Sequence, residues 1–271
     1  MVLIAILALA CERSTAPGVS GSTFPAGAVA FAPPARYALW WSMTESCSGR
    51  SADRNAVQWY VMPGQSIFTV DGKIYEAIWF NAPDRIVLGE NARNDAALVR
   101  HEMLHVLLQR AGHPRDAFLG ACGDIVQCVG ECETEAGGRT PPPADAPVLT
   151  PEEVGVRLDL WPPSPAASID SGAAALVVSI TNPRSEGAWV QLTPRQSGSP
   201  VSDTFGVNVT FTGTGADLLL TSATEFGTRF PLGANETRRW VWDGQLIPGQ
   251  FDVRAWFNSD TTARRTIDVG P

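Results

Sequence analysis

Apolar and polar positions change their period along this chain. Between residues 56 and 88, short apolar runs rich in β-branched and aromatic residues alternate with turn pairs, and Asp71-Gly72 is a good hairpin signal. This pattern predicts a group of short strands at Ala56–Met62, Ile67–Val70, Lys73–Phe80 and Arg85–Leu88. Before them, Tyr37–Thr44 has the apolar density of a short packed helix.

After residue 88 the pattern becomes helical. Asn94 or Asp95 is a suitable N-cap, residues 95–110 are expected to form a helix, and Gly112 stands where a C′ glycine belongs. Apolar residues leave this helix almost no polar face, so we expect it to be buried. They are Leu98, Val99, Met103, Leu104, Val106, Leu107 and Leu108.

A proline- and glycine-rich stretch at residues 137–150 predicts a linker between two folded regions. Residues 151–271 show no convincing helix, and their short apolar runs at regular spacing predict an antiparallel β-sandwich of about seven or eight strands. The expected strands are Val154–Leu160, Ala174–Asn182, Trp189–Thr193, Gly206–Thr212, Asp217–Thr221, Thr237–Trp242, Gln250–Phe257 and Thr266–Val269. This region resembles bacterial immunoglobulin-like accessory domains around residues 179–183 and 248–253.

The first residues read as an export signal. Residues 1–10 are uninterruptedly apolar but far too few to span a bilayer, which needs about 20 residues. Ala8-Leu9-Ala10-Cys11 resembles the lipobox of bacterial lipoproteins, which implies an acylated Cys11 as the membrane anchor. Residues 12–34 then predict a flexible tether. The alternative is a buried N-terminal strand or helix.

Composition narrows the possible partners. The chain has 28 acidic and 20 basic residues, a net charge of −8 and no basic cluster, which excludes nucleic-acid binding. Its 44% hydrophobic and 18% charged residues are typical of a folded globular protein.

Four further cysteines, Cys47, Cys122, Cys128 and Cys132, indicate disulfides. An even number in an exported chain predicts two bridges, with three possible connectivities that the sequence does not decide. We expect Cys47 and Cys122 to join the first helix to the segment after the candidate site. A zinc cluster of Cys122, Cys128 and Cys132 is the alternative, but their spacing does not match the paired CxxC of structural zinc sites.

The chemically most specific pattern is His101-Glu-Met-Leu-His105, which spells HExxH on the predicted helix. Histidines four residues apart share one helix face, so both imidazoles can reach one cation, and Glu102 can take a proton from a metal-bound water. Burying these groups without partners would cost several kcal/mol, which a metal ion and its water would offset. The chain's three histidines, His101, His105 and His113, all lie within 13 residues. Alternatively, backbone carbonyls satisfy the histidines and Glu102 pairs with Arg100 or Arg110.

On this motif, residues 35–135 resemble the zincins, the HExxH zinc metallopeptidases. The resemblance implies an α+β domain at residues 35–136 with a small mixed sheet over the motif helix. It also implies an edge strand directly before that helix, here Arg85–Leu88, to which a peptide substrate adds as a further strand. The whole fold expected is this α+β domain followed by an all-β antiparallel sandwich at residues 151–271.

The third zinc ligand decides the subfamily. In metzincins it is a histidine six residues after the second, here Ala111, followed by a methionine turn, and no methionine follows Met103. We favour His113, because an αL Gly112 would end the helix and turn the next residue toward the metal. The alternatives are a glutamate, as in gluzincins, or an aspartate, as in aspzincins. The acidic candidates are Asp116, Asp124, Glu131, Glu133 and Glu135.

The resulting hypothesis is an extracytoplasmic, lipid-anchored zinc metallopeptidase that cleaves peptide or protein substrates. Zn²⁺ held by His101, His105 and His113 would activate water, with Glu102 as the general base. Tyr60, Tyr75 and Arg115 are candidates for a further electrophile. Two alternatives stay open: an envelope binding or adhesion lipoprotein with a non-catalytic metal site, and a zinc amidase that acts on the cell wall.

Overall fold

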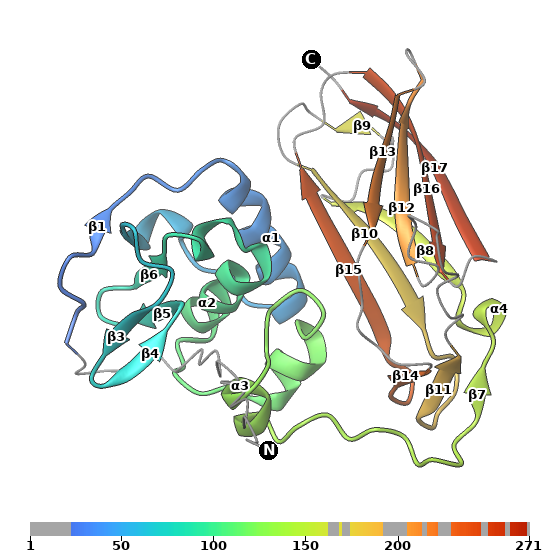
Figure 1. Ribbon diagram of the computed structural model, residues 1–271, viewed down its shortest axis with the longest axis horizontal. Helices are drawn as coiled ribbons and strands as arrows, with labels where there is room; N and C mark the ends of the chain where they lie inside the picture. Colours follow the sequence, from blue (N-terminus) through green and yellow to red (C-terminus); the bar gives the residue numbers. More distant parts are fainter. Residues whose placement is uncertain are drawn as a thin grey trace, which may run out of the picture. The chain divides into compact units, whose positions relative to one another are not determined.

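The computed structural model describes residues 23–161, 168–169, 174–191, 205–212, 216–221, 229–244, 249–257 and 261–269. The expected signal, lipobox Cys11 and residues 12–22 of the expected tether therefore lie outside the described residues. Within them the chain is a mixed α+β protein rich in strands, with several sheets and few helices (Figure 1). No helix in these ranges combines the length and apolar character that a membrane crossing requires.

The chain forms two compact units. The first contains the described residues up to Pro33 together with Ser48–Gly138, and the second contains Pro34–Cys47 and the residues from Arg139 onward. Helix α1 (Arg36–Ser48) thus falls almost entirely in the second unit, where the indole Nε1 of Trp161 donates to Ser42 Oγ. The sequence had assigned this helix to the N-terminal domain.

A four-stranded sheet organises the first unit. Its order is β1-β2-β6-β5, with β2 and β6 parallel and the other pairs antiparallel. A separate hairpin of β3 and β4 turns at Asp71-Gly72, where the sequence predicts it. The elements of this unit are β1 (Val29–Ala30), β2 (Gln58–Met62), β3 (Phe68–Val70), β4 (Lys73–Tyr75), β5 (Ala77–Phe80), β6 (Arg85–Gly89), α2 (Ala96–Leu108) and α3 (Glu131–Glu135).

Strands β1 and β5 form the two edges of this sheet and β6 (Arg85–Gly89) lies inside it, so the expected edge strand Arg85–Leu88 was wrong. The run Lys73–Phe80 breaks at Glu76 into two strands, and the second folds back antiparallel to β6 and displaces it from the edge. All four residues of β5 are buried, because α2 packs along this strand and an apolar cluster covers the other side. That cluster consists of Met62, Phe68, Val70, Tyr75, Ile78, Phe80 and Val87.

Helix α2 begins at the predicted cap. The carboxylate of Asp95 accepts hydrogen bonds from the backbone N–H groups of Ala97 and Leu98. The helix ends at Gln109, whose αL conformation (φ 47°) lets its N–H reach the carbonyls of His105 and Val106. The expected αL glycine at Gly112 was therefore wrong, because the chain reverses three residues earlier.

The second unit consists mainly of strands, as predicted, in three sheets ordered β15-β10-β8, β14-β11-β7 and β13-β12-β16-β17-β9. All pairings are antiparallel except β7 with β11 and β9 with β17. The strands are β7 (Val148–Leu149), β8 (Val156–Trp161), β9 (Ser168–Ile169), β10 (Ala174–Thr181), β11 (Ala188–Gln191), β12 (Phe205–Phe211), β13 (Ala216–Thr221), β14 (Arg229–Leu232), β15 (Thr237–Gly244), β16 (Gly249–Phe257) and β17 (Thr261–Val269).

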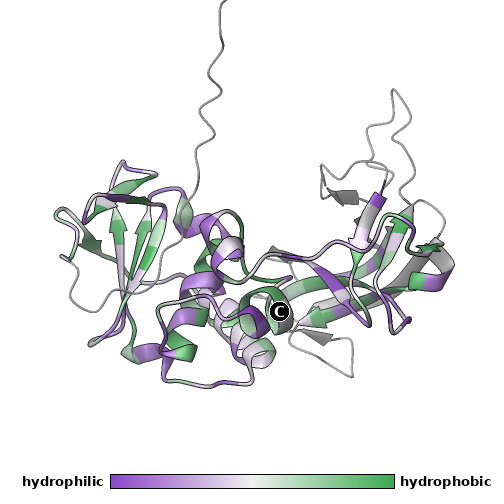
Figure 2. Ribbon diagram, turned by 90° about the horizontal axis from the view of Figure 1, so that it is seen from below, coloured by the Kyte–Doolittle hydropathy of each residue, from purple (hydrophilic) through white to green (hydrophobic). Residues whose placement is uncertain are grey.

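One short helix departs from the expectation for residues 151–271. Helix α4 (Pro151–Val154) begins at Thr150, whose hydroxyl and backbone form a capping box with Glu153. Thr150-Pro-Glu-Glu153 carries the sequence signature of such a box, and proline is favoured in the first helical turn. Val154 then joins an apolar cluster of this unit with Leu149, Ile180, Ala188, Val190 and Leu232. Hydrophobic residues (green in Figure 2) lie along strands of both units.

Candidate metal centre

Helix α2 carries both histidines and the glutamate of the HExxH motif into the interior. His101, Glu102 and His105 have no solvent exposure. The four-residue spacing sets the two imidazoles on one helix face, with their Nε2 atoms 3.1 Å apart. The structure therefore brings together the two groups that the motif was expected to pair.

His113 joins them from the segment after the helix. Its Nε2 lies 3.3 Å from Nε2 of His101, and its ring centroid is 5.0 Å from that of His105. The reversal at Gln109 makes this approach possible, because it folds the following residues back along the helix end. The three histidines of the chain thus form one buried cluster.

Each histidine has an oxygen partner at its other ring nitrogen. Nδ1 of His101 contacts the carbonyl oxygen of Gln127 at 2.6 Å, and Nδ1 of His105 contacts that of Arg110 at 2.8 Å. Nδ1 of His113 lies 2.6 Å from Oε2 of Glu135, on α3. Carbonyl and carboxylate oxygens only accept, so each Nδ1 carries a hydrogen, which assigns the tautomer.

This assignment leaves the Nε2 lone pair of His101 facing those of His105 and His113. Neutral imidazoles with hydrogen on Nδ1 have no donor at Nε2, so the Nε2 contacts of 3.1 and 3.3 Å are not hydrogen bonds. Burial supports the neutral state, because desolvation lowers the pKa of all three rings and brings that of His105 to about 3. Electron pairs that face one another without a proton form an environment that favours a cation.

The spacing of the cluster fits a bound metal ion. Zn–N bonds of about 2.0–2.1 Å in a tetrahedral site place ligand nitrogens about 3.3–3.4 Å apart. The observed contacts of 3.1 and 3.3 Å are close to this value. The oxygen partners at Nδ1 also match the outer hydrogen bonds that orient metal-bound histidines. His101 and His113 therefore belong to a possible metal-binding group, and His105 adjoins it through Nε2 of His101.

Glu102 lies buried on the same helix without a hydrogen-bond partner at either carboxylate oxygen. The backbone N–H of Trp79 is near enough to lower its pKa, but desolvation is the larger effect and raises the pKa well above the usual range. The alternative in which Arg100 or Arg110 neutralises Glu102 is therefore not found among the described residues. Arg100 instead donates through Nε to the carbonyl of Ile125.

Two aromatic side chains enclose the histidines. The ring of Phe118 lies 4.9 Å from those of His101 and His105 and 4.8 Å from that of His113, measured between centroids. The indole of Trp79, on β5, stacks nearly parallel to His105 at 6.0 Å. Both walls are apolar and fully buried, so they hold the imidazoles in position and exclude water from their faces.

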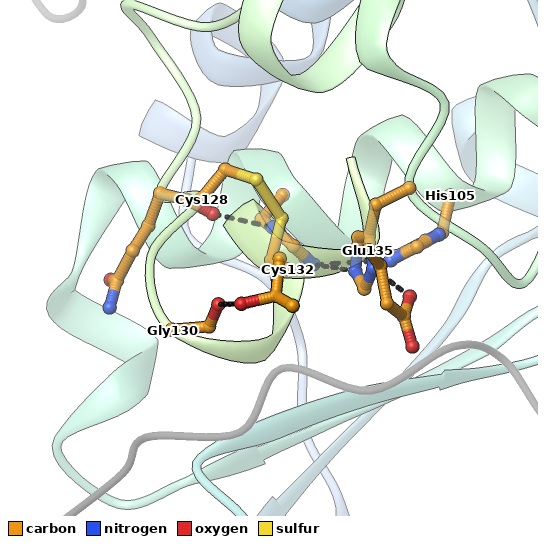
Figure 3. The surroundings of a disulfide bond; sticks show 9 residues. His105, Cys128, Gly130, Cys132 and Glu135 are labelled. Atoms are coloured by element: carbon orange, nitrogen blue, oxygen red, sulfur yellow. Dashed lines mark hydrogen bonds and ion pairs between the residues drawn. A yellow bond between two sulfur atoms is a disulfide. The ribbon is translucent and has the colours of Figure 1, made fainter. Parts of the chain in front are cut away.

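A sulfur atom also reaches this group. A ring nitrogen of His101, a ring nitrogen of His113 and Sγ of Cys132 lie within 4.8 Å of one another. Cys132 is bonded to Cys128, as Figure 3 shows, and Cys47 and Cys122 are disulfide-bonded too. All four predicted cysteines therefore take part in disulfides, so the alternative of a cysteine zinc cluster is not realised.

The acidic alternatives to His113 lie in other positions. Glu135 contacts His113 itself, so it holds this ring instead of replacing it. Glu131 pairs with Lys73, and Asp116 is exposed. Asp124 and Glu133 also stand outside the possible metal-binding group found among the described residues.

The candidate electrophiles are also engaged elsewhere. Arg115 donates to the backbone carbonyls of Gly137 and Gly138, and Tyr60 donates to Gln58. Tyr75 belongs to the apolar cluster on the sheet, where burial is the main cause that raises its pKa. The charge of Glu102 contributes to that shift, so Tyr75 is the candidate with an electrostatic link to the site.

Several groups of the site carry no signal in the sequence. The carbonyls of Gln127 and Arg110 belong to the backbone, and the position of Phe118 depends on the path of an irregular helical segment, Asp116–Ala121. Glu135 was considered only as a ligand. The sequence predicts Cys132 as a disulfide cysteine, with a cysteine zinc cluster as the alternative, and no spacing rule relates it to the histidines.

No family model and no curated protein matches this chain. Among solved structures, it is similar to an alkylpurine DNA glycosylase from Pseudomonas fluorescens at 14% identity, covering 44% of this chain and 31% of that one, with a TM-score of 0.29. A β-glucosidase from Listeria innocua matches at 13% identity, 44% and 16% coverage and a TM-score of 0.27. A β-glucosidase from Erythrobacter marinus matches at 12% identity, 70% and 25% coverage and a TM-score of 0.26.

The chain spans less than a third of the length of each of these three proteins. Likenesses with such low TM-scores carry no argument about function. The chemistry of this chain therefore has to be argued from its own buried site.

Proposed function

We propose that this chain is a zinc-dependent metallopeptidase of the zincin class. The observation that carries the proposal is the approach of the unprotonated Nε2 atoms of His105 and His113 to that of His101, on the helix that also carries the unpartnered carboxyl of Glu102. Three imidazoles from an HExxH helix and a following segment suit zinc, which takes nitrogen ligands in a tetrahedral arrangement.

Zinc, when bound, would supply a Lewis acid that polarises the scissile carbonyl and acidifies a coordinated water in the fourth position. The catalytic side chain that the protein would contribute is Glu102. Its raised pKa makes the carboxylate a better base than an exposed glutamate, and no arginine neutralises it. Glu102 would accept the proton of the attacking water and deliver it to the leaving amine.

Strand β5 would position the peptide. It is one of the two edges of the four-stranded sheet, and its Trp79 stacks on His105. A substrate that added antiparallel or parallel to this edge would have its backbone carbonyls close to the histidine cluster. The substrate strand would therefore align on Ala77–Phe80, in place of the Arg85–Leu88 edge that the sequence suggested.

The remaining parts of the chain would place this activity outside the cytoplasm. The disulfides are compatible with an oxidising compartment, and the lipobox-like Cys11 would provide the anchor. The strands of the second unit would form an immunoglobulin-like sandwich that acts as an accessory domain. Neither the anchor nor the sandwich would be needed for hydrolysis itself.

The test compares the wild-type chain with Glu102→Gln and His105→Ala. We expect one zinc per wild-type and per Glu102→Gln chain, and loss of zinc from His105→Ala. Hydrolysis of casein-type peptides should be abolished in both variants, while peptidoglycan fragments should stay uncleaved by all three proteins. Equal hydrolysis by wild type and Glu102→Gln would overturn the role of Glu102, and cleavage of peptidoglycan alone would favour the amidase.

One observation favours a second candidate, a binding lipoprotein with a non-catalytic metal site. His101, Glu102 and His105 are completely buried, so a peptide cannot reach them without an opening movement. If zinc binds stoichiometrically and no peptide or cell-wall substrate is cleaved, this second function holds. Detectable peptide hydrolysis that depends on Glu102 would exclude it.

A further inference from the structure

The disulfide beside the histidine cluster joins two cysteines that differ in their relation to the site. Cys132 is completely buried, and its sulfur lies within 4.8 Å of ring nitrogens of both His101 and His113. Cys128 does not belong to this group. Figure 3 shows the disulfide next to the histidines, on the same short segment that carries Glu135.

Helix α3 therefore holds two groups that face the cluster. Glu135 accepts from Nδ1 of His113, and Cys132, three residues earlier, places its sulfur near the same ring. While it is bonded to Cys128, this sulfur is no thiolate and is a poor metal ligand. Once free, it would be a strong ligand beside three neutral imidazoles.

The geometry points to Cys132 as a redox-controlled fourth ligand of the metal at this site, an inference that rests on the proposed function. With the disulfide formed, three histidines bind the metal and the fourth position stays open for water. With the disulfide reduced, the Cys132 thiolate occupies that position. A site closed by four protein ligands is of the structural type, so hydrolysis stops.

The distances allow this change with little movement. In a tetrahedral zinc site a thiolate sulfur lies about 3.6 Å from each nitrogen ligand, given Zn–S and Zn–N bonds of about 2.3 and 2.0–2.1 Å. The sulfur of Cys132 is within 4.8 Å of its two nitrogen neighbours. Rotation about the Cα–Cβ bond of the freed cysteine moves Sγ by more than the difference of roughly 1 Å.

The chemical step balances with a dithiol reductant. Two electrons and two protons from the dithiol break the Cys128–Cys132 bond and give two thiols, while the reductant is oxidised to its own disulfide. The Cys132 thiol then releases its proton to solvent on binding the metal. A disulfide oxidant reverses the step: it accepts the two electrons and two protons and becomes a dithiol, the Cys128–Cys132 bond forms again, and the fourth position reopens.

Two single substitutions test this without any reductant. Cys128→Ser leaves Cys132 permanently free, and Cys132→Ser leaves Cys128 free, so both lose the same disulfide and keep one thiol. Each full-length variant and the wild type are loaded with Co²⁺ in place of zinc. We expect sulfur-to-cobalt charge-transfer absorption in the near ultraviolet for Cys128→Ser and none for Cys132→Ser or the wild type.

Peptide hydrolysis by the zinc forms should be lost in Cys128→Ser and retained in the oxidised wild type. A Cys128→Ser chain that binds Co²⁺ without the charge-transfer band, or equal bands in both variants, would overturn the inference. Failure of the oxidised wild type to bind either metal would instead overturn the proposed function. Circular dichroism of both variants detects misfolding. If Cys128→Ser is misfolded, the wild type takes its place, after anaerobic reduction and removal of the reductant before it is loaded with Co²⁺.

Discussion

At the scale of single residues, the site depends on groups that fix the histidine tautomers. Glu135 is the one side chain among these groups, because Nδ1 of His101 and Nδ1 of His105 contact backbone carbonyls, which substitution cannot remove. Its carboxylate makes a charge-assisted hydrogen bond to Nδ1 of His113 and raises the basicity of Nε2 on the same ring. Glu135 is therefore the side chain whose substitution can change the tautomer and basicity of a histidine in the cluster.

Replacing Glu135 with alanine should weaken zinc binding about 10- to 100-fold, because His113 loses the group that orients its ring. Glu135→Gln, whose amide oxygen still accepts, should lose less. Competition with a coloured chelator measures the affinity. Glu133→Ala, on the same short helix but outside the metal-binding group, is the control and should leave affinity unchanged.

The lowered pKa of His105 predicts how acid affects the metal-free protein. The unfolded chain binds a proton at this histidine near pH 6.5, whereas the folded chain resists protonation down to about pH 3. Between these values the unfolded state binds more protons, so the free energy of unfolding falls as pH falls. The slope contributed by one such histidine approaches about 1.4 kcal/mol per pH unit.

The raised pKa of Glu102 acts in the opposite sense, because the folded state then holds the extra proton. Urea unfolding of the chelator-treated Glu102→Gln chain removes this contribution and should show the loss of stability between about pH 6 and pH 4. Adding His105→Gln should reduce the slope, and His101 and His113, whose pKa values are also lowered, should account for what remains. Equal slopes for the two proteins would contradict the burial of a neutral His105.

At the scale of elements, a hydrogen-bonded chain ties strand β5 to the end of helix α2. Asp84 accepts from the indole Nε1 of Trp79 at 2.9 Å and from Nε2 of Gln109 at 3.0 and 3.2 Å. The amide of Gln109 also donates to the carbonyl of Val106. A non-glycine residue in the αL region is disfavoured, so these bonds stabilise the turn that brings Arg110 and His113 back to the cluster.

Replacing Asp84 with alanine should lower the stability of the first unit by about 1–3 kcal/mol, because the Trp79 and Gln109 donors both lose their acceptor. It should also weaken zinc binding, since Trp79 stacks on His105. Asp84→Asn keeps one acceptor oxygen and should show a smaller loss of both. Urea unfolding and chelator competition measure the two effects, and unchanged zinc affinity in Asp84→Ala would contradict this coupling.

The sequence predicted most of these elements from local pattern. Helix α2 and its Asp95 cap, the Asp71-Gly72 hairpin and eight strands of the second unit follow from periodicity and turn residues. The edge position of β5 did not follow, because strand order depends on pairing between distant segments. Nor did the αL residue, since glycine statistics favoured Gly112 and a tertiary contact with Asp84 selected Gln109.

In the candidate site, too, some features could be predicted from local sequence and others could not. The HExxH spacing is local, so it predicted the juxtaposition of His101 and His105. His113 was favoured because of an expected αL Gly112, whereas the structure turns the chain at Gln109. The contributions of Phe118, Trp79, Cys132 and the backbone carbonyl of Gln127 arise from tertiary structure. Residue types and spacing define potential ligands, while the packed fold decides what orients them.

At the scale of the whole molecule, the two compact units carry separate interiors. The cluster around Ile78 and Val87 belongs to the first, and the cluster around Ile180 and Val190 belongs to the second. All three histidines and Glu102 lie in the first unit. Ligand binding stabilises only the cooperative unit that contains the site, so a bound metal should raise the free energy of unfolding of the first unit alone.

Calorimetry of the full chain should therefore show two unfolding transitions, of which chelation lowers one. At a free zinc concentration of 100 times the dissociation constant, the metal contributes about 2.7 kcal/mol to the first unit. Chelation should lower the midpoint temperature of this unit's transition by a few degrees and should leave that of the second unit unchanged within error. In His105→Ala the transition of the first unit should already lie at the lower temperature, and the chelator should not change it. A single transition, or two that shift together, would show that the units unfold cooperatively and that the metal stabilises both.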